Sequence, residues 1–146
     1  MKIQALGHVV LKVTDLARAE AFYGGLLGLP IVAHYHENGM HMTFFSLGDH
    51  HNFAIAEVPG DGSAPSEIQP GLHHVAFRIG DNLDQLREAK AKIEAAGLTP
   101  APVDHEVTKS LYFADPDGNG IELYVDVSDV WRREPGRVAY AEPMAL

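Results

Sequence analysis

Three side chains of this sequence have the types and the spacing of metal ligands. Residues 7–13 (Gly-His-Val-Val-Leu-Lys-Val) align with residues 73–79 (His-His-Val-Ala-Phe-Arg-Ile). His8 and His74 therefore occupy equivalent positions, 74 − 8 = 66 residues apart. Glu122 follows in the last strand-like stretch of the second copy. Two imidazoles and one carboxylate form a facial ligand set that leaves coordination positions open, which suits Fe(II). Imidazole also binds nickel and zinc, so the ligand types alone do not select the metal.

The pattern of each strand predicts which way these side chains point, because side chains of a strand alternate between its two faces. Alternate positions are apolar in all three strands and are expected to pack on helices: Val9, Leu11 and Val13, then Val75, Phe77 and Ile79, then Ile121, Leu123 and Val125. His8, His74 and Glu122 therefore project from the opposite face. Tyr112, which stands between two apolar residues, is expected on that face as well. If two curved sheets pair through the repeat, the four side chains converge in one cup.

Each half of the chain reads strand, helix, strand, strand, strand. Two helices are predicted, 16–23 between Asp15 and Gly28, and 83–96 between Asp81 or Asn82 and Gly97. Asp or Asn caps the first turn of a helix, and Gly takes the left-handed conformation that ends it. Strands are predicted after the helices at 31–35, 40–47 and 52–58, then at 99–103, 110–114 and 120–125.

These elements predict an α+β fold class, with two paired βαβββ modules whose curved mixed sheets form a metal-holding cup. The first module is expected at 1–58 and the second at 72–127. A linker at 59–71, which opens with a Pro- and Gly-rich stretch, joins them, and a C-terminal tail follows at 128–146.

The composition excludes several classes of function. The 146 residues carry 20 acidic and 11 basic side chains, and this net charge of −9 disfavours binding to nucleic acid phosphates. The absence of cysteine excludes disulfides, thiolate metal sites and a cysteine nucleophile. No apolar run approaches a membrane span, and the N-terminus lacks the apolar core of a signal peptide. We therefore expect a cytoplasmic protein without nucleic acid or membrane partners.

Motifs of the second half resemble a known superfamily. Eight positions match the extradiol ring-cleavage dioxygenase signature in type and spacing: Val103, His105, Leu111-Tyr112, Asp115-Pro116, Gly118 and Glu122, with Leu111-Tyr112 and Asp115-Pro116 as adjacent pairs. With the duplicated pattern over residues 3–127, they resemble the vicinal oxygen chelate superfamily, which includes glyoxalases, bleomycin-binding proteins and extradiol dioxygenases. The chain is most similar to the type I extradiol enzymes. A fold alone does not fix the reaction.

The resemblance implies a metal and a reaction. His8, His74 and Glu122 would hold Fe(II), with Mn(II) as the alternative. The implied reaction cleaves a catechol-type aromatic diol with O2 to a ring-opened semialdehyde or ketone, as in aromatic degradation. The resemblance also implies a homo-oligomer, a dimer or larger.

The resemblance further implies three catalytic residues. His105 and Tyr112 would contact substrate oxygens or intermediates. Residues 49–54 resemble the segment that supplies the acid–base histidine of these enzymes, with His51 the better match and His50 the open alternative. Strict alternation would turn His51 away from the cup, but it stands at a strand start where regular pleating need not hold.

Two alternatives of other classes stay open. A glyoxalase I-like isomerase needs a fourth ligand, and the repeat offset carries Glu122 back to 122 − 66 = 56, which is Ala56, or to Ala54 with a two-residue gap. Neither can ligate, and neighbouring Glu57 is expected to face the other way. A non-catalytic antibiotic-binding protein of the bleomycin-sequestering kind would lack the metal ligands. Residues 115–118 have a plain structural explanation as a tight turn.

Overall fold

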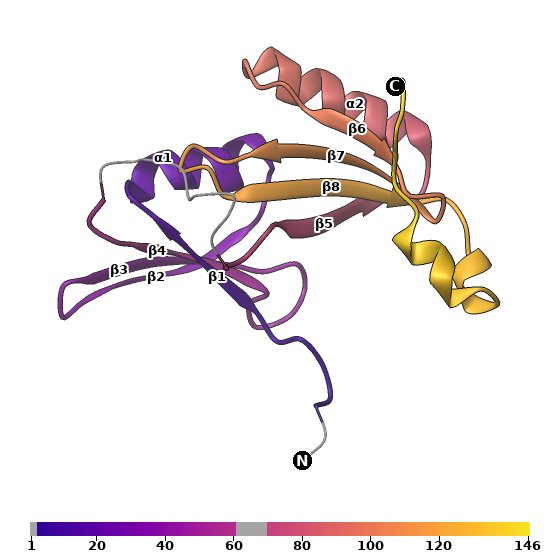
Figure 1. The fold of residues 1–146 in the computed structure, drawn as a ribbon. Coiled ribbons are helices and arrows are strands. Elements are labelled where there is room, and N and C mark those ends of the chain that lie inside the picture. Colours follow the sequence, from indigo (N-terminus) through magenta and orange to yellow (C-terminus); the bar gives the residue numbers. More distant parts are fainter. Residues whose placement is uncertain (1–2, 61–69) are drawn as a thin grey trace. The chain divides into compact units, whose positions relative to one another are not determined.

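The computed structural model describes residues 3–60 and 70–146 and divides them into two compact units (Figure 1). Unit 1 comprises residues 3–60 together with 115–118, and unit 2 comprises 70–114 and 119–146. Most of the predicted linker, 59–71, lies outside the described residues. Within the described ranges, no helix is long and apolar enough to cross a membrane.

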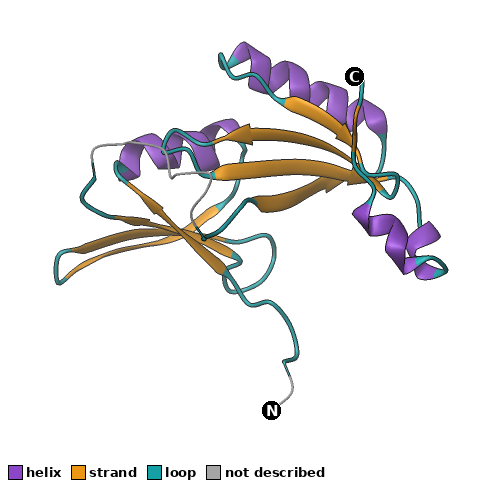
Figure 2. Cartoon of the chain, in the orientation of Figure 1, coloured by secondary structure: helices purple, strands orange, loops and turns teal. Residues whose placement is uncertain are grey.

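Unit 1 is a four-stranded mixed sheet that carries one helix (Figures 1 and 2). In chain order its elements are β1 (Val9–Val13), α1 (Leu16–Glu20), a π-helical segment (Ala21–Leu26), β2 (Ile31–Glu37), β3 (Met40–Phe45) and β4 (Phe53–Glu57). The strand order is β1-β4-β3-β2, in which β1 runs parallel to β4 and the other pairs are antiparallel. This is the βαβββ module that the sequence predicts.

Unit 2 repeats this plan and extends it by one strand. Its elements are β5 (Val75–Gly80), α2 (Leu83–Ala95), β6 (Ala101–Asp104), β7 (Thr108–Ala114), β8 (Gly120–Asp126), two 3-10 helices (Val130–Arg132 and Pro135–Ala139) and β9 (Glu142–Pro143). The strand order is β5-β8-β7-β6-β9, with β5 parallel to β8. The α+β fold class, built from two βαβββ modules, is thus confirmed.

The helix of unit 1 begins where the sequence predicts and ends later. Oδ1 of Asp15 accepts a hydrogen bond from the Arg18 backbone N–H at 2.9 Å, which caps the first turn. The helix then widens into the π-helical segment and extends beyond the predicted end at residue 23. Gly28 follows it with φ at +78°, the left-handed conformation expected of a terminating glycine.

The cap of α2 is Asn82 rather than Asp81. Its side-chain oxygen accepts from the Gln85 N–H at 3.1 Å, and the Gln85 side chain accepts from the Asn82 N–H at 3.3 Å, which forms a capping box. Gly97 ends this helix with φ at +83°. The apolar stripe of α2 contributes Leu86 to the core of unit 2, where it packs with residues of β7 and β8.

Strand alternation turns the apolar residues of β1 and β8 toward the core and the residues between them to the opposite face, as predicted. In β1, Leu11 and Val13 are 3% and 1% exposed, whereas Val10 between them is 42% exposed. In β8 the alternate positions Ile121 and Val125 are fully buried, so the side chain at position 122 points to the opposite face of the sheet. The same alternation therefore builds the core and leaves a second face for polar groups.

The C-terminal residues fold back onto unit 2. β9 pairs antiparallel with β6, so it forms the edge strand of the sheet. Beyond it the Met144 N–H donates to the Pro102 carbonyl at 3.2 Å, and Leu146 packs against the core cluster beneath α2. The sequence predicted a tail without a strand here, because a two-residue strand that contains a proline shows no alternation.

Residues 115–118 form the predicted tight turn and belong to unit 1. The Gly118 N–H donates to the Asp115 carbonyl at 3.0 Å, and Gly118 has φ at +82°. The buried Tyr23 hydroxyl donates to Oδ2 of Asp115 at 2.6 Å, and the Arg18 guanidinium contacts Oδ1 of Asp117 at 2.9 Å. Side chains of α1 and of the π-helical segment thus hold both carboxylates of the turn.

Removing the Tyr23 hydroxyl is expected to destabilise unit 1. Burial, and next the charge of Asp115, raise the pKa of Tyr23, so its hydroxyl stays protonated and donates. Tyr23→Phe leaves a buried carboxylate oxygen with one partner fewer, and should lower the free energy of unfolding by about 1–3 kcal/mol in urea denaturation. Tyr35→Phe in β2 is the matched control, with a change below about 0.5 kcal/mol. Equal effects of the two variants would contradict this account of the turn.

Candidate metal centre

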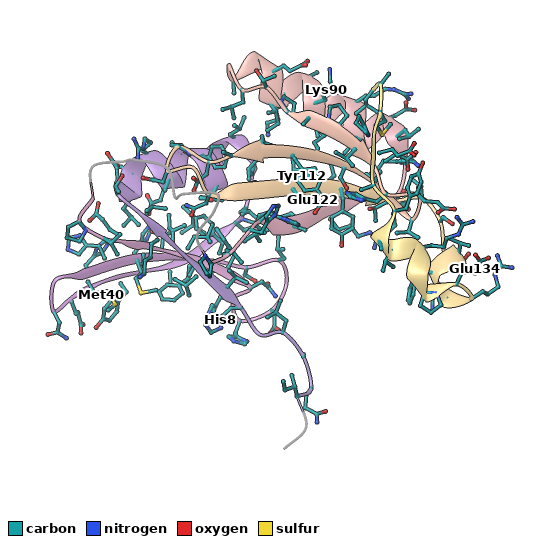
Figure 3. The ribbon with its side chains drawn as sticks, viewed as in Figure 1. His8, Met40, Lys90, Tyr112, Glu122 and Glu134 are labelled. Atoms are coloured by element: carbon teal, nitrogen blue, oxygen red, sulfur yellow. The ribbon has the colours of Figure 1, made fainter. Side chains whose placement is uncertain are left out.

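Neighbouring strands of unit 2 place His74 beside Glu122. His74 directly precedes β5, and Glu122 is the third residue of β8. These strands pair in parallel with Val75 opposite Ile121 and Ala76 opposite Glu122. Nε2 of His74 lies 3.0 Å from Oε2 of Glu122. Figure 3 labels Glu122 on β8 and Tyr112 on β7, which lie opposite each other in the paired strands.

The separation of the two side chains fits a divalent metal. Transition-metal ions hold nitrogen and oxygen ligands at about 2.1 Å, so two ligands at right angles stand about 3.0 Å apart. That is the distance between the His74 nitrogen and the Glu122 oxygen. A direct hydrogen bond between imidazole and carboxylate has the same length. The separation is therefore compatible with a shared ion and equally with a direct hydrogen bond.

The other oxygen of Glu122 is held by a buried serine. Glu122 is only 7% exposed, and Oγ of the fully buried Ser110 donates to its Oε1 at 2.6 Å. A hydrogen bond to the free oxygen of a ligating carboxylate fixes its orientation, and such outer contacts typically change metal affinity about 10- to 100-fold. Ser110 lies two residues before Tyr112 on the same face of β7. The alternation that identified Tyr112 could also have pointed to Ser110, which the sequence reasoning missed.

His73 contacts the second nitrogen of His74, because the two Nδ1 atoms are 2.7 Å apart. If His74 bound a metal through Nε2, its Nδ1 would carry the proton and donate it to His73. His73 would then fix the tautomer of the ligand, a role that no sequence pattern suggested. Gly120 permits the close approach of the chain at His73 and His74, since a Cβ at Gly120 would lie 2.4 Å from the His73 carbonyl oxygen.

Tyr112 and His105 extend this polar cluster. The Tyr112 hydroxyl lies 2.9 Å from Nε2 of His105, and the rings of Tyr112 and His74 meet edge to face at 5.4 Å. Burial, and then a hydrogen bond with Glu122, raise the pKa of Tyr112, so its phenol stays protonated at neutral pH. Unit 2 therefore brings together four predicted site residues: His74, Glu122, Tyr112 and His105.

Unit 1 brings together two more. The ring of His51 lies 4.4 Å from that of His8 and 5.3 Å from that of Phe44. His51 precedes β4 outside its regular pleat, so alternation does not turn it away from His8. Burial, and then the nearby charge of His8, lower the pKa of His51, which favours the neutral imidazole. His50 is the more exposed of the two candidates and contacts the Asp49 carboxylate at 3.1 Å.

Within the residues that the structure describes, neither unit by itself assembles three or more His, Asp or Glu side chains around one point. His74 and Glu122 stand together in unit 2, and His8 belongs to unit 1. The three-ligand site therefore stays a prediction.

No fourth ligand is offered by β4. Oε1 of Glu57 accepts from the Leu16 N–H at the start of α1 at 3.1 Å, and its Oε2 contacts Nδ1 of His41 at 3.1 Å. Glu57 thus caps the helix on the apolar side of the sheet, as the alternation predicted. Ala54 and Ala56 have no ligating atoms.

Comparisons with known proteins agree with the fold. The profile of the Glyoxalase/Bleomycin resistance protein/Dioxygenase superfamily matches residues 5–123. Biphenyl-2,3-diol 1,2-dioxygenase 3 of Rhodococcus globerulus is 35% identical over 128 residues, which cover 83% of this chain and 63% of that protein. This chain therefore spans less than two thirds of that relative's length.

Two further likenesses cover almost the whole length of the proteins compared. The metallothiol transferase FosB of Lysinibacillus sphaericus is 26% identical over 145 residues, 92% of this chain and 94% of that protein. The crystal structure of a glyoxylase/bleomycin resistance protein/dioxygenase domain from Frankia sp. EAN1pec has a TM-score of 0.73 at 20% identity, and covers 86% of this chain and 99% of that one. The second likeness concerns the fold alone.

Gly120→Ala is expected to displace His74. The added Cβ would meet the His73 backbone, which must move, and such overpacking costs about 1–3 kcal/mol of unfolding free energy. NMR spectra should show the imidazole signals of His74 shifted, and urea denaturation should show the loss of stability. Gly136→Ala is the control, because a Cβ at Gly136 meets no atom within 4 Å. Unchanged His74 signals in the Gly120 variant would show that the close approach does not position this histidine.

Proposed function

Because this chain belongs to the Glyoxalase/Bleomycin resistance protein/Dioxygenase superfamily, we propose that it is an Fe(II)-dependent extradiol dioxygenase of catechol-type diols. The 35% identity to a biphenyl-2,3-diol dioxygenase supports this choice within the superfamily. The observation that carries the proposal is the polar cluster of unit 2, in which the His74–Glu122 pair adjoins Tyr112 and His105.

His8, His74 and Glu122 are the proposed ligands, with Mn(II) as the alternative metal. When bound, Fe(II) would supply a coordination sphere open to both diol oxygens and to O2. Ser110 would hold the Glu122 carboxylate, and His73 would hold the His74 ring. A homo-oligomer, a dimer or larger, is part of the proposal.

The remaining site residues would handle protons and charge. The Tyr112 phenol is protonated, so it can donate a hydrogen bond to a negatively charged substrate oxygen. His51, whose neutral form is favoured, would accept and return the proton of the second hydroxyl as the acid–base residue. His105 contacts Tyr112 and would assist it. The ring would open beside a hydroxylated carbon, and the product would carry both oxygen atoms of O2.

The first test is Fe(II) binding and catechol cleavage by the whole chain. Protein loaded anaerobically should bind Fe(II) and convert at least one of catechol, 3-methylcatechol and 2,3-dihydroxybiphenyl to a yellow product. His8→Ala, His74→Ala and Glu122→Gln should each weaken Fe(II) binding more than about 100-fold and abolish the product. His36→Ala in β2 is the matched histidine control and should behave as the unaltered protein.

The outcomes separate the two parts of the proposal. Fe(II) binding that depends on the three residues, without yellow product from any diol, would refute the dioxygenase and leave the metal site. Failure of the unaltered protein to bind Fe(II) anaerobically would refute the metal site as well.

Tyr112→Phe should lower turnover without removing the metal. The variant loses the phenol that is proposed to donate to the substrate oxygen, and removing such a donor typically lowers kcat about 100- to 1,000-fold. Fe(II) affinity, measured anaerobically, should stay within about threefold because Tyr112 is not a proposed ligand. Tyr35→Phe is again the control. An unchanged kcat for Tyr112→Phe would exclude Tyr112 from the reaction.

A second candidate function is a metal-dependent thiol transferase. The observation in its favour is the share of each relative that the match covers. The match covers 94% of the metallothiol transferase but only 63% of the biphenyl-2,3-diol dioxygenase. It would use the same three ligands. Thiol consumption by Mn(II)-loaded protein in the presence of an electrophile, without cleavage of any diol, would favour this candidate. The glyoxalase alternative lacks support from Glu57, which is occupied at the start of α1.

A further inference from the structure

The C-terminal segment of unit 2 contacts the turn that carries His105. Nδ1 of His105 lies 2.8 Å from the backbone carbonyl oxygen of Tyr140, and Nε2 lies 2.9 Å from the Tyr112 hydroxyl. We propose that residues 134–146 position His105 for the reaction, because the Tyr140 carbonyl fixes its proton on Nδ1 and leaves Nε2 as the acceptor for Tyr112. This inference deepens the proposed function and rests on it for its catalytic consequence.

The chemistry of the two contacts determines the tautomer. A carbonyl oxygen can only accept a hydrogen bond, so Nδ1 of His105 must carry a proton to make the Tyr140 contact. In a neutral imidazole the other nitrogen is then an acceptor. Nε2 therefore accepts from the Tyr112 hydroxyl, which lies 2.9 Å away.

The tautomer of His105 determines which group accepts the hydrogen bond from the Tyr112 hydroxyl. The hydroxyl has two acceptors within reach, Nε2 of His105 and the carboxylate of Glu122. If Nε2 carried the proton, it would donate to the Tyr112 oxygen and drive the phenol proton toward Glu122. With the proton on Nδ1, Nε2 instead accepts the phenol proton in the protein without substrate and keeps it from Glu122. A negatively charged substrate oxygen, the stronger acceptor, would then replace Nε2 as the partner of the Tyr112 hydroxyl. His105 is thus a positioning residue that acts through Tyr112.

Several contacts hold the C-terminal segment in place. β9 pairs with β6, which leads directly into the turn at His105, and the Met144 N–H donates to Pro102. The Arg137 guanidinium lies 3.1 Å from the carboxylate of Glu106, the residue after His105. Glu106 has φ at +62°, an unfavourable conformation for a residue with a side chain, so it needs outside support to persist. Oδ1 of Asp104 accepts from the Glu106 backbone N–H at 2.6 Å, and Arg137 adds an ion-pair contact to the Glu106 carboxylate.

The direct test is the tautomer of His105 in the unaltered, full-length protein. Long-range 15N–1H NMR distinguishes Nδ1–H from Nε2–H, and His105→Gln assigns the signals. At a pH of about 8.5, above the ordinary histidine pKa of about 6.5, the metal-free protein should show His105 with its proton on Nδ1. An imidazole in water prefers the Nε2–H form. An Nε2–H form or a mixture at His105 would overturn the proposal.

A matched pair of variants tests the role of the segment. Arg137→Ala should raise the Nε2–H fraction of His105 and lower kcat about tenfold, with KM and Fe(II) affinity nearly unchanged. Arg137→Lys should restore part of both effects, and Arg133→Ala, which removes the same charge nearby, should change neither. Met144→Pro loosens the segment by another route, since it removes the N–H donated to Pro102. Variants with the tautomer of the unaltered protein would overturn the proposal.

The tautomer results, unlike the kcat results, are independent of the proposed reaction. The tautomer is measured without metal or substrate, so a fixed Nδ1–H form in a protein that cleaves no diol would refute the dioxygenase and not the positioning of His105. A mixed tautomer of His105 in a protein that cleaves diols would refute the positioning of His105 and leave the dioxygenase proposal standing.

Discussion

The buried carboxylate of Glu122 is the constraint on which unit 2 depends. A carboxylate that is almost removed from water must be paired and hydrogen-bonded, because burying it alone is strongly unfavourable. β5 and β7 flank β8 and supply the partners, with His74 at one oxygen and Ser110 at the other. The strand order therefore supplies hydrogen-bond partners for the Glu122 carboxylate as well as apolar side chains for the core, and it brings the His74 Nε2 to 3.0 Å from the Glu122 Oε2.

The same pleat that satisfies Glu122 also separates it from the apolar core. Leu111 and Val125 face α2, and the residues beside them in the chain face the other way. A one-residue slip of β8 against β7 would carry Glu122 into the apolar layer, so the core fixes the register that the polar face needs. Stability and the candidate site thus rest on one pairing pattern.

Polar groups outside the regular strands complete both units. In unit 1 the side chains of Tyr23 and Arg18 hold the turn at 115–118, and in unit 2 the Tyr140 carbonyl orients His105. Each contact joins residues far apart in the sequence and uses a group that a periodic pattern does not reveal. These contacts fix the orientation of side chains that strand pairing alone would leave free, such as the imidazole of His105.

The sequence by itself determined the α+β class, the duplicated βαβββ modules, the superfamily and the face on which Glu122 lies, because alternation, helix caps and repeat spacing are local properties of the chain. It left the choice between Asp81 and Asn82 to the structure, and it missed Ser110, His73 and β9. Only the tertiary structure decided which partners meet, such as His51 with His8 or Tyr140 with His105. The physical reason is that these contacts depend on strand order and chain reversal, which bring together residues that no local pattern relates.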